Sequence, residues 1–116
     1  ILGSKKVLVL SQNITTAVTD QYNADVYNIP AIQKQYDVLE KEIKANTAKE
    51  FKVSETSLQS KKSNYENFNK ETENFLATLR KVLREAETSK TITERQASEI
   101  HNGYQNVISR YNNFVD

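Results

Sequence analysis

Glycine and proline are almost missing from this chain, and their scarcity restricts its fold more than any other feature. The 116 residues include two glycines, Gly3 and Gly103, and one proline, Pro30. Tight turns between strands depend on glycine, proline or Asn-Gly and Asp-Gly pairs, so a strand-rich chain of this composition could rarely reverse direction. Helices joined by short polar loops have no such need. The sequence therefore predicts an all-α protein.

The clearest helical pattern runs from residue 58 to residue 86. Large apolar side chains recur there at alternating steps of three and four, which places them on one face of a helix. We predict a helix over residues 54–88, with Ser54 as its N-cap because a serine hydroxyl can accept from the free amides of the first turn. The stripe consists of Leu58, Tyr65, Phe68, Thr72, Phe75, Leu79, Val82 and Ala86, with the charged Lys61 at the position between Leu58 and Tyr65.

The last predicted helix, over residues 93–115, has a distinct start signal. Thr93 is followed three residues later by Gln96, which is the spacing of a capping box. The stripe that follows keeps its phase across Gly103, so we expect an unbroken helix there. Residues 88–91 form a short loop, which makes the last two helices antiparallel neighbours. The stripe consists of Ala97, Ile100, Tyr104, Val107, Tyr111 and Phe114.

Two further helices are predicted upstream, over about 7–27 and 30–50. Pro30 fits the first turn of the second, where its missing N–H costs nothing. Residues 1–6 are expected as a first helical turn or as an extended or disordered arm of a single domain spanning residues 1–116. The fold prediction is an antiparallel four-helix bundle. The alternative is a three-helix bundle, in which residues 31–87 form one long helix or Pro30 kinks a continuous one.

The composition excludes several kinds of chemistry. The net charge is +1 and no basic stripe appears, so nucleic acid is not an expected partner. There is no cysteine, and His101 is the single histidine, which leaves too few ligands for a zinc or di-iron site. No glycine-rich phosphate loop exists. We therefore predict no catalytic residue, no metal site and no cofactor, and expect that the protein is not an enzyme.

Five aromatic residues are the candidate contact residues. They lie on the facing stripes of the last two predicted helices, and two interpretations stay open for them. They could fill the seam between the helices as core, with tyrosine hydroxyls at its edge. They could instead line a ligand slot between helices. The residues are Tyr65, Phe68, Phe75, Tyr104 and Tyr111.

Two short patches resemble a known family. The segment from Tyr104-Gln105-Asn106-Val107 to Tyr111-Asn112, together with Ile29-Pro30 far upstream, is similar to the LemA family of helical membrane-anchored proteins. The arginine pair and the tryptophan expected near these patches in that family are absent from this sequence. The resemblance implies a helical fold, and no function is carried over from it.

The functional expectation is a non-enzymatic helical interaction, scaffold or sensor-input module. The alternative is a small-molecule binding domain with an aromatic-lined pocket between helices. A protein partner or self-association is expected, and a membrane only through a segment outside the given chain. The short apolar pieces Ile1-Leu2 and Val7-Leu8-Val9-Leu10 could follow a removed signal or an anchor. An extracellular, periplasmic or cell-envelope location is therefore favoured over the cytoplasm.

Overall fold

The described part of the chain is entirely helical apart from its short connections. A computed structural model describes residues 2–22, 28–48 and 62–114. Four helices form there: α1 (Leu2–Tyr22), α2 (Ile29–Ala48), α4 (Lys62–Ser89) and α5 (Glu94–Phe114). No strand occurs within those three ranges. The all-α prediction is therefore confirmed.

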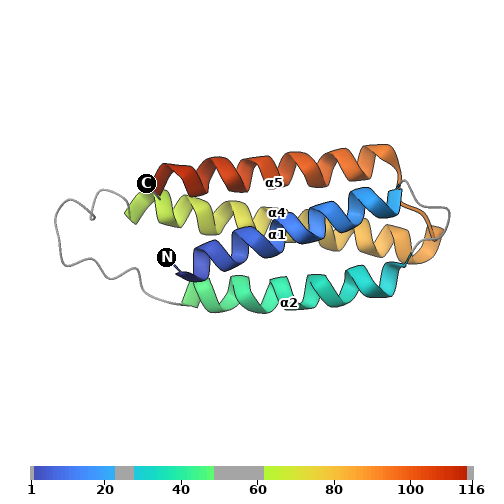
Figure 1. Ribbon diagram of the computed structural model, residues 1–116, viewed down its shortest axis with the longest axis horizontal. Coiled ribbons are helices and arrows are strands. Elements are labelled where there is room, and N and C mark those ends of the chain that lie inside the picture. Colours follow the sequence, from blue (N-terminus) through green and yellow to red (C-terminus); the bar gives the residue numbers. More distant parts are fainter. Residues whose placement is uncertain (1, 23–27, 49–61, 115–116) are drawn as a thin grey trace.

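The helices form an antiparallel four-helix bundle, which Figure 1 shows from the side. α1 packs against α2 and α5, and α4 packs against the same two helices, so α1 and α4 lie on one diagonal. Every pair of neighbours along the chain is antiparallel. The alternative of one long helix over residues 31–87 is wrong, because α2 and α4 lie side by side. A continuous helix kinked at Pro30 is wrong for the same reason, since α1 and α2 also pack side by side.

The first helix begins earlier than the sequence predicts. α1 already begins at Leu2, so residues 2–6 are helical rather than an arm. The cause is burial, because Ser4 and Val7 are both 0% exposed in the bundle. The predicted helix ends at residues 27 and 50, and the predicted start at Ser54 with the stripe residue Leu58, lie outside the described residues.

Local hydrogen bonds explain where α2 and α5 start. The side-chain Oδ1 of Asn28 accepts from the amide of Ala31 at 3.2 Å, which makes Asn28 the N-cap and places Pro30 in the first turn. The capping box is confirmed in both directions. The amide of Gln96 donates to Thr93 Oγ1 at 3.1 Å, and the amide of Thr93 donates to Gln96 Oε1 at 2.9 Å.

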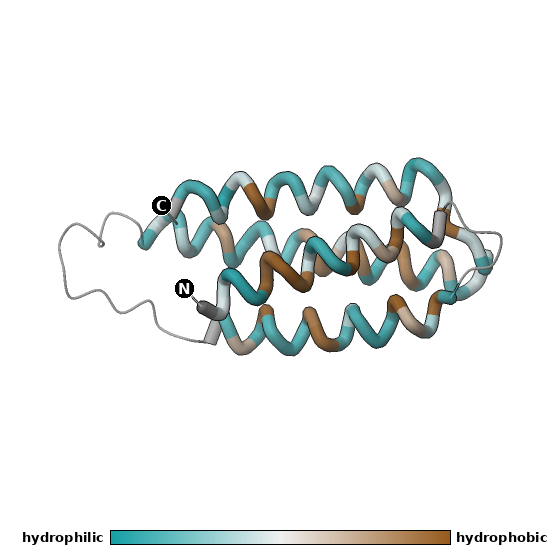
Figure 2. Tube along the Cα trace, viewed as in Figure 1, coloured by the Kyte–Doolittle hydropathy of each residue, from teal (hydrophilic) through white to brown (hydrophobic). Residues whose placement is uncertain are grey.

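The core runs along the whole bundle. Figure 2 shows apolar positions recurring along each helix. Phe68, Phe75 and Leu79 of the predicted α4 stripe and Val107 of the predicted α5 stripe are all buried. The largest fully buried side chains are Phe68, Phe75, Ile14, Ile32, Leu39, Leu79, Ile92, Ile100, Val7, Val18, Val82 and Val107.

Hydroxyl groups allow α1 to be buried although it is rich in serine and threonine. Ser11 Oγ donates to the carbonyl of Val7 at 2.8 Å, and Thr15 Oγ1 donates to the carbonyl of Ser11 at 2.8 Å. Such bonds to the carbonyl four residues earlier satisfy the hydroxyl within its own helix. Both side chains can therefore face the core without an unpaired polar atom. Of the four helices described, none has the length and apolar character that crossing a membrane requires.

Candidate functional site

The five predicted contact residues lie in or beside the core. Tyr65, Phe68 and Phe75 of α4 are 5%, 0% and 1% exposed. Tyr104 and Tyr111 of α5 are half-buried and pack against the same core. The rings of Phe68 and Tyr111 meet edge to face, with centroids 5.9 Å apart and an interplanar angle of 60°. The structure thus brings the two aromatic stripes together as a packed seam between the helices.

A polar groove opens between α4 and α5 at Gly103. It has a volume of about 410 Å³, and Phe75 and Gly103 are among the residues that line it. Phe75 is the one member of the predicted aromatic set that contributes to this groove. Its walls carry amide, hydroxyl and carboxylate groups rather than apolar side chains. The wall residues are Glu71, Asn74, Thr78, Glu99, Asn102 and Asn106.

The carboxylates of this groove are already engaged with arginines. Arg110 lies 3.5 Å from Glu71 Oε2, and Arg95 lies 3.5 Å from Glu99 Oε1. Asn74 also donates to Glu71, at 3.2 Å. Each of the two carboxylates in the groove wall therefore has a partner.

A buried polar cluster centred on Asn46 joins three helices at the end of the bundle where α1 begins. Tyr65 of α4 donates its hydroxyl to the main-chain oxygen of Asn46 at 3.0 Å. Asn46 Nδ2 donates to Asn69 Oδ1 at 2.7 Å, and Ser4 of α1 donates to Asn46 Oδ1 at 3.5 Å. Asn46 is 3% exposed, and no buried side-chain polar atom among the described residues lacks a partner. The cluster fixes the register of α1, α2 and α4.

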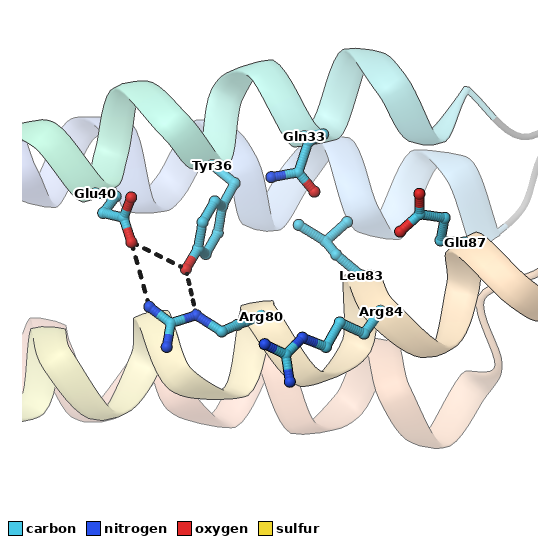
Figure 3. A pocket seen from close by; sticks show the side chains of 7 residues that line it. All are labelled: Gln33, Tyr36, Glu40, Arg80, Leu83, Arg84 and Glu87. Atoms are coloured by element: carbon cyan, nitrogen blue, oxygen red, sulfur yellow. Dashed lines mark hydrogen bonds and ion pairs between the residues drawn. The ribbon is translucent and has the colours of Figure 1, made fainter.

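A second polar network lies on the surface between α2 and α4 (Figure 3). Arg80 of α4 donates through Nε to the hydroxyl of Tyr36 at 2.9 Å and through Nη2 to Glu40 at 3.2 Å. Tyr36 also donates to Glu40, at 3.4 Å. The hollow beside this network has a volume of about 250 Å³ and extends past Arg84 and Glu87.

The chemistry of this network is structural. The hydrogen bond that Arg80 donates to Tyr36, the charge interaction with Tyr36 and then the contacts with Glu40 raise the pKa of Arg80 above its usual value. Arg80 is a cation, as arginine side chains are in proteins generally. It ties α2 to α4 across the surface.

An apolar hollow lies on the opposite side of α2, between α1 and α2. It has a volume of about 200 Å³ and is lined by Leu10, Asn13, Lys34, Gln35 and Val38. Val38 is 52% exposed, and Val9, the neighbour of Leu10, is 45% exposed. These two valines are the large hydrophobic side chains that remain exposed within the described residues. Unlike the other grooves, this one offers a mainly apolar surface.

Sequence reasoning did not identify this α1/α2 groove, although one signal was present. Val7-Leu8-Val9-Leu10 places four apolar residues in succession, and one face of a helix can bury only some of them. Val7 is fully buried, and Val9 points outward as a result. The same logic applies at Val38, which precedes the fully buried Leu39.

Metal ligands do not gather within the part of the chain that the structure describes. No group of three histidine, cysteine, aspartate or glutamate side chains there could hold an ion. His101, the single histidine of the sequence, is exposed on α5.

No family model matches the chain, and neither a curated protein nor a solved structure matches it. The likeness of two short patches to the LemA family therefore adds nothing to the argument on function, which depends on the residues and their arrangement alone.

Proposed function

We propose that this chain is a non-enzymatic interaction module, a helical bundle that binds a protein partner on its outer surface. The observation that supports the proposal is the α1/α2 groove. Scattered exposed apolar residues need no explanation in a folded protein. Here, however, Leu10 and the exposed Val38 line one hollow, and clustered exposed apolar surface is typical of interaction sites.

The energetics favour covering this groove. Fully burying a valine is worth about 1.5–3 kcal/mol. Val38, which lines the hollow, is 52% exposed, so a partner that covers it gains about 1 kcal/mol. Phe68 and Phe75, two of the candidate aromatic residues, are already buried, so a partner could cover little further apolar surface on them.

Site-specific photo-crosslinking in the source cells tests the proposal. Benzoylphenylalanine in place of Val38 should form a covalent adduct with a protein. The control places the same group at Glu73, which is exposed on α4, the helix that does not contact α1 closely. Adducts at Val38 and none at Glu73 support a protein partner on the α1/α2 face. Equal adducts at both positions, or none at either, would overturn the proposal.

A small-molecule binding domain is the second candidate, and the groove at Gly103 favours it. Its volume of about 410 Å³ falls within the range of about 300–1,000 Å³ that is usual for ligand pockets. The lining of this groove is polar and open to solvent, whereas most ligand pockets are mainly apolar. Native mass spectrometry of the purified protein separates the two proposals. A retained ligand that is lost in Asn102→Leu would favour the second candidate, and the mass of the bare chain would favour the first.

A further inference from the structure

Charged residues are unevenly distributed over the four helices. α1 contains three and α5 contains four, whereas α2 contains six and α4 contains ten. Residues 7–19 of α1 and residues 100–109 of α5 include no Asp, Glu, Lys or Arg. α1 and α5 pack against each other and run antiparallel (Figure 1), so these two stretches adjoin halfway along one side of the bundle. We call this side the α1/α5 face.

The middle of the α1/α5 face is exposed and free of the four charged residue types. The side of α1 that is turned toward α2 carries Lys6 and Leu10, and the helical period places Val9, Gln12 and Thr16 on the side turned away from α2. All three are exposed. The surface of α5 beside them carries exposed His101 and Gln105. Protein interfaces are depleted of charged residues at their centre, as this face is.

The two ends of the face carry opposite charges. Lys5 and Asp20 lie 15 residues apart on α1, which is about 22 Å along the helix. Both are exposed, and neither forms an ion pair within the described ranges. No charged residue lies three or four positions from either of them in the sequence. Glu94 begins α5 beside the end of α1, so it adds a second negative charge at the Asp20 end.

The neighbouring charges at these ends are engaged within the chain. Lys6 pairs with Glu42 of α2 at 3.0 Å, and Arg110 of α5 pairs with Glu71 of α4 at 3.5 Å. Lys5 therefore stays available at one end of the face and Asp20 at the other. A surface with a positive end, an uncharged middle and a negative end is complementary to a second copy of itself turned end for end.

We infer that a second copy of this chain docks on the α1/α5 face, with the two α1 helices antiparallel and Lys5 of each copy against Asp20 of the other. The midpoint between residues 5 and 20 lies between residues 12 and 13, so Gln12 lies near the two-fold axis. Val9 of each copy then faces Thr16 of the other. This dimer leaves the α1/α2 groove open, so the inference does not depend on the proposed function.

The charges also select the direction of the two-fold axis. An axis parallel to the helices would place α1 of each copy over α5 of the other and bring ends of the same sign together. Lys5 would then approach Lys5 of the second copy, and Asp20 and Glu94 would approach their own counterparts. An axis perpendicular to the helices brings opposite signs together at both ends, which favours the antiparallel arrangement.

The size of the face corresponds to a reversible dimer. α1 and α5 are each 21 residues long, or about 30 Å, and packed helices lie about 10 Å apart. The face therefore covers about 600 Å² on each copy, and two copies bury about 1,200 Å², the lower limit of stable interfaces. A membrane surface is a poorer occupant, because it would need large apolar or aromatic side chains where this face has Val9 among polar residues.

Sedimentation velocity of the full chain and of charge variants tests the inference. The parent should convert from monomer to dimer between about 10 µM and about 1 mM. Lys5→Glu alone, or Asp20→Lys alone, should weaken the dimer about tenfold, because each change turns two attractions into two repulsions. The two changes together exchange the charges and should restore the parent affinity to within about twofold. Lys81→Glu, the same reversal at an exposed position of α4, should have no effect.

A cysteine near the axis tests the antiparallel arrangement separately. The sequence contains no cysteine, so one introduced thiol reports on one contact. Gln12→Cys should form a disulfide-linked dimer on mild oxidation, since the two positions meet near the two-fold axis. Lys81→Cys on α4, diagonally across the bundle from α1, should stay monomeric under the same conditions. Circular dichroism checks that every variant is folded.

Three results would overturn the inference: a monomer at every concentration, a dimer that Lys5→Glu leaves intact, or a double variant that stays as weak as the single ones. Binding of a monomeric chain to phosphatidylcholine vesicles would assign the face to a membrane instead. If the chain stays monomeric while crosslinking at Val38 captures a different protein, the dimer inference fails and the proposed function stands. A dimer with the predicted charge response and no adduct at Val38 gives the reverse outcome.

Discussion

Gly103 lies so close to the ring of Phe75 that a Cβ on Gly103 would stand 3.1 Å from Phe75 Cδ1. Phe75 is 1% exposed, so its ring is enclosed and has little room to shift. A glycine inside a helix costs up to about 1 kcal/mol relative to alanine. α5 accepts that cost because the missing side chain lets it approach α4 over a large buried ring.

Gly103→Ala should therefore destabilise the protein, against the usual helix preference for alanine. Crowding a packed core costs about 1–3 kcal/mol, which exceeds the propensity gain of up to about 1 kcal/mol. We expect the free energy of unfolding to fall by about 1 kcal/mol in urea melts.

Two controls isolate the contact between Gly103 and Phe75. Asn102→Ala, at the adjacent exposed position, should raise the free energy of unfolding by a few tenths of a kcal/mol. In a Phe75→Leu background the cost of Gly103→Ala should shrink, since the flexible leucine can yield. Stabilisation by Gly103→Ala in the parent would show that the ring can move aside.

Phe75→Ala should be among the most damaging single changes. Truncating a buried phenylalanine costs about 3–5 kcal/mol, out of a total stability of about 5–15 kcal/mol for a domain of this size. Lys70→Ala, at an exposed position of the same helix, should change stability by no more than about 0.5 kcal/mol. Urea melts of the two variants decide the matter. If Phe75→Ala unfolds at the same urea concentration as the parent, Phe75 does not contribute to the core as predicted.

The sequence predicted features that depend on local spacing. The stripe of α4 and α5 placed Phe68, Phe75 and Val107 in the core, because a period near 3.6 decides which side chains share a face. The reciprocal bonds of Thr93 and Gln96 followed from their spacing alone. Such features need no knowledge of which helices are neighbours.

Features that depend on packing between helices could not be predicted in this way. Asn46 reads as a polar residue near a helix end, and its role at the centre of a buried cluster follows only from the meeting of α1, α2 and α4. The exposure of Val38 also depends on how the helices pack. Periodicity shows which apolar residues can be buried together, and tertiary packing decides which one is left uncovered.

Tyr65→Phe should cost about 1–2 kcal/mol of stability. The change removes the hydroxyl that donates to the main-chain oxygen of the buried Asn46, and a buried acceptor left without its donor is costly. Tyr104→Phe is the matched control, because Tyr104 is half-buried and forms no hydrogen bond through its hydroxyl within the described residues. Its effect should stay within about 0.5 kcal/mol. Equal effects in urea melts would contradict a specific role for the Asn46 cluster.

Tyr104 should make stability depend on pH in the alkaline range. Burial raises the pKa of Tyr104 above its ordinary value, so the unfolded chain loses this proton before the folded chain does. The folded state then loses stability as pH rises above about 10, and the contribution is complete below that pH. Urea melts at pH about 8 and about 11 should show a smaller alkaline loss for Tyr104→Phe than for the parent. Identical losses would contradict the shift.

Lys90 ends α4 in a backbone conformation that favours glycine. Its φ is 63°, and its amide donates to the carbonyl of Ala86 at 2.7 Å, which closes the last turn. The left-handed region costs a residue with a Cβ about 1–2 kcal/mol, and glycine escapes that cost. Glycine also gives the unfolded chain more freedom, which offsets part of the gain. Lys90→Gly should therefore raise the free energy of unfolding by about 0.5–1 kcal/mol.

The same substitution elsewhere on α4 should have the opposite sign. Lys81 is exposed in the middle of the helix, and no positive φ is recorded there. Lys81→Gly should lower the free energy of unfolding by about 0.5–1 kcal/mol, because glycine is a poor helix former. Urea melts of both variants beside the parent provide the measurement. If both variants lose stability alike, the backbone at residue 90 is right-handed in solution, and α4 continues past Ser89 instead of ending there.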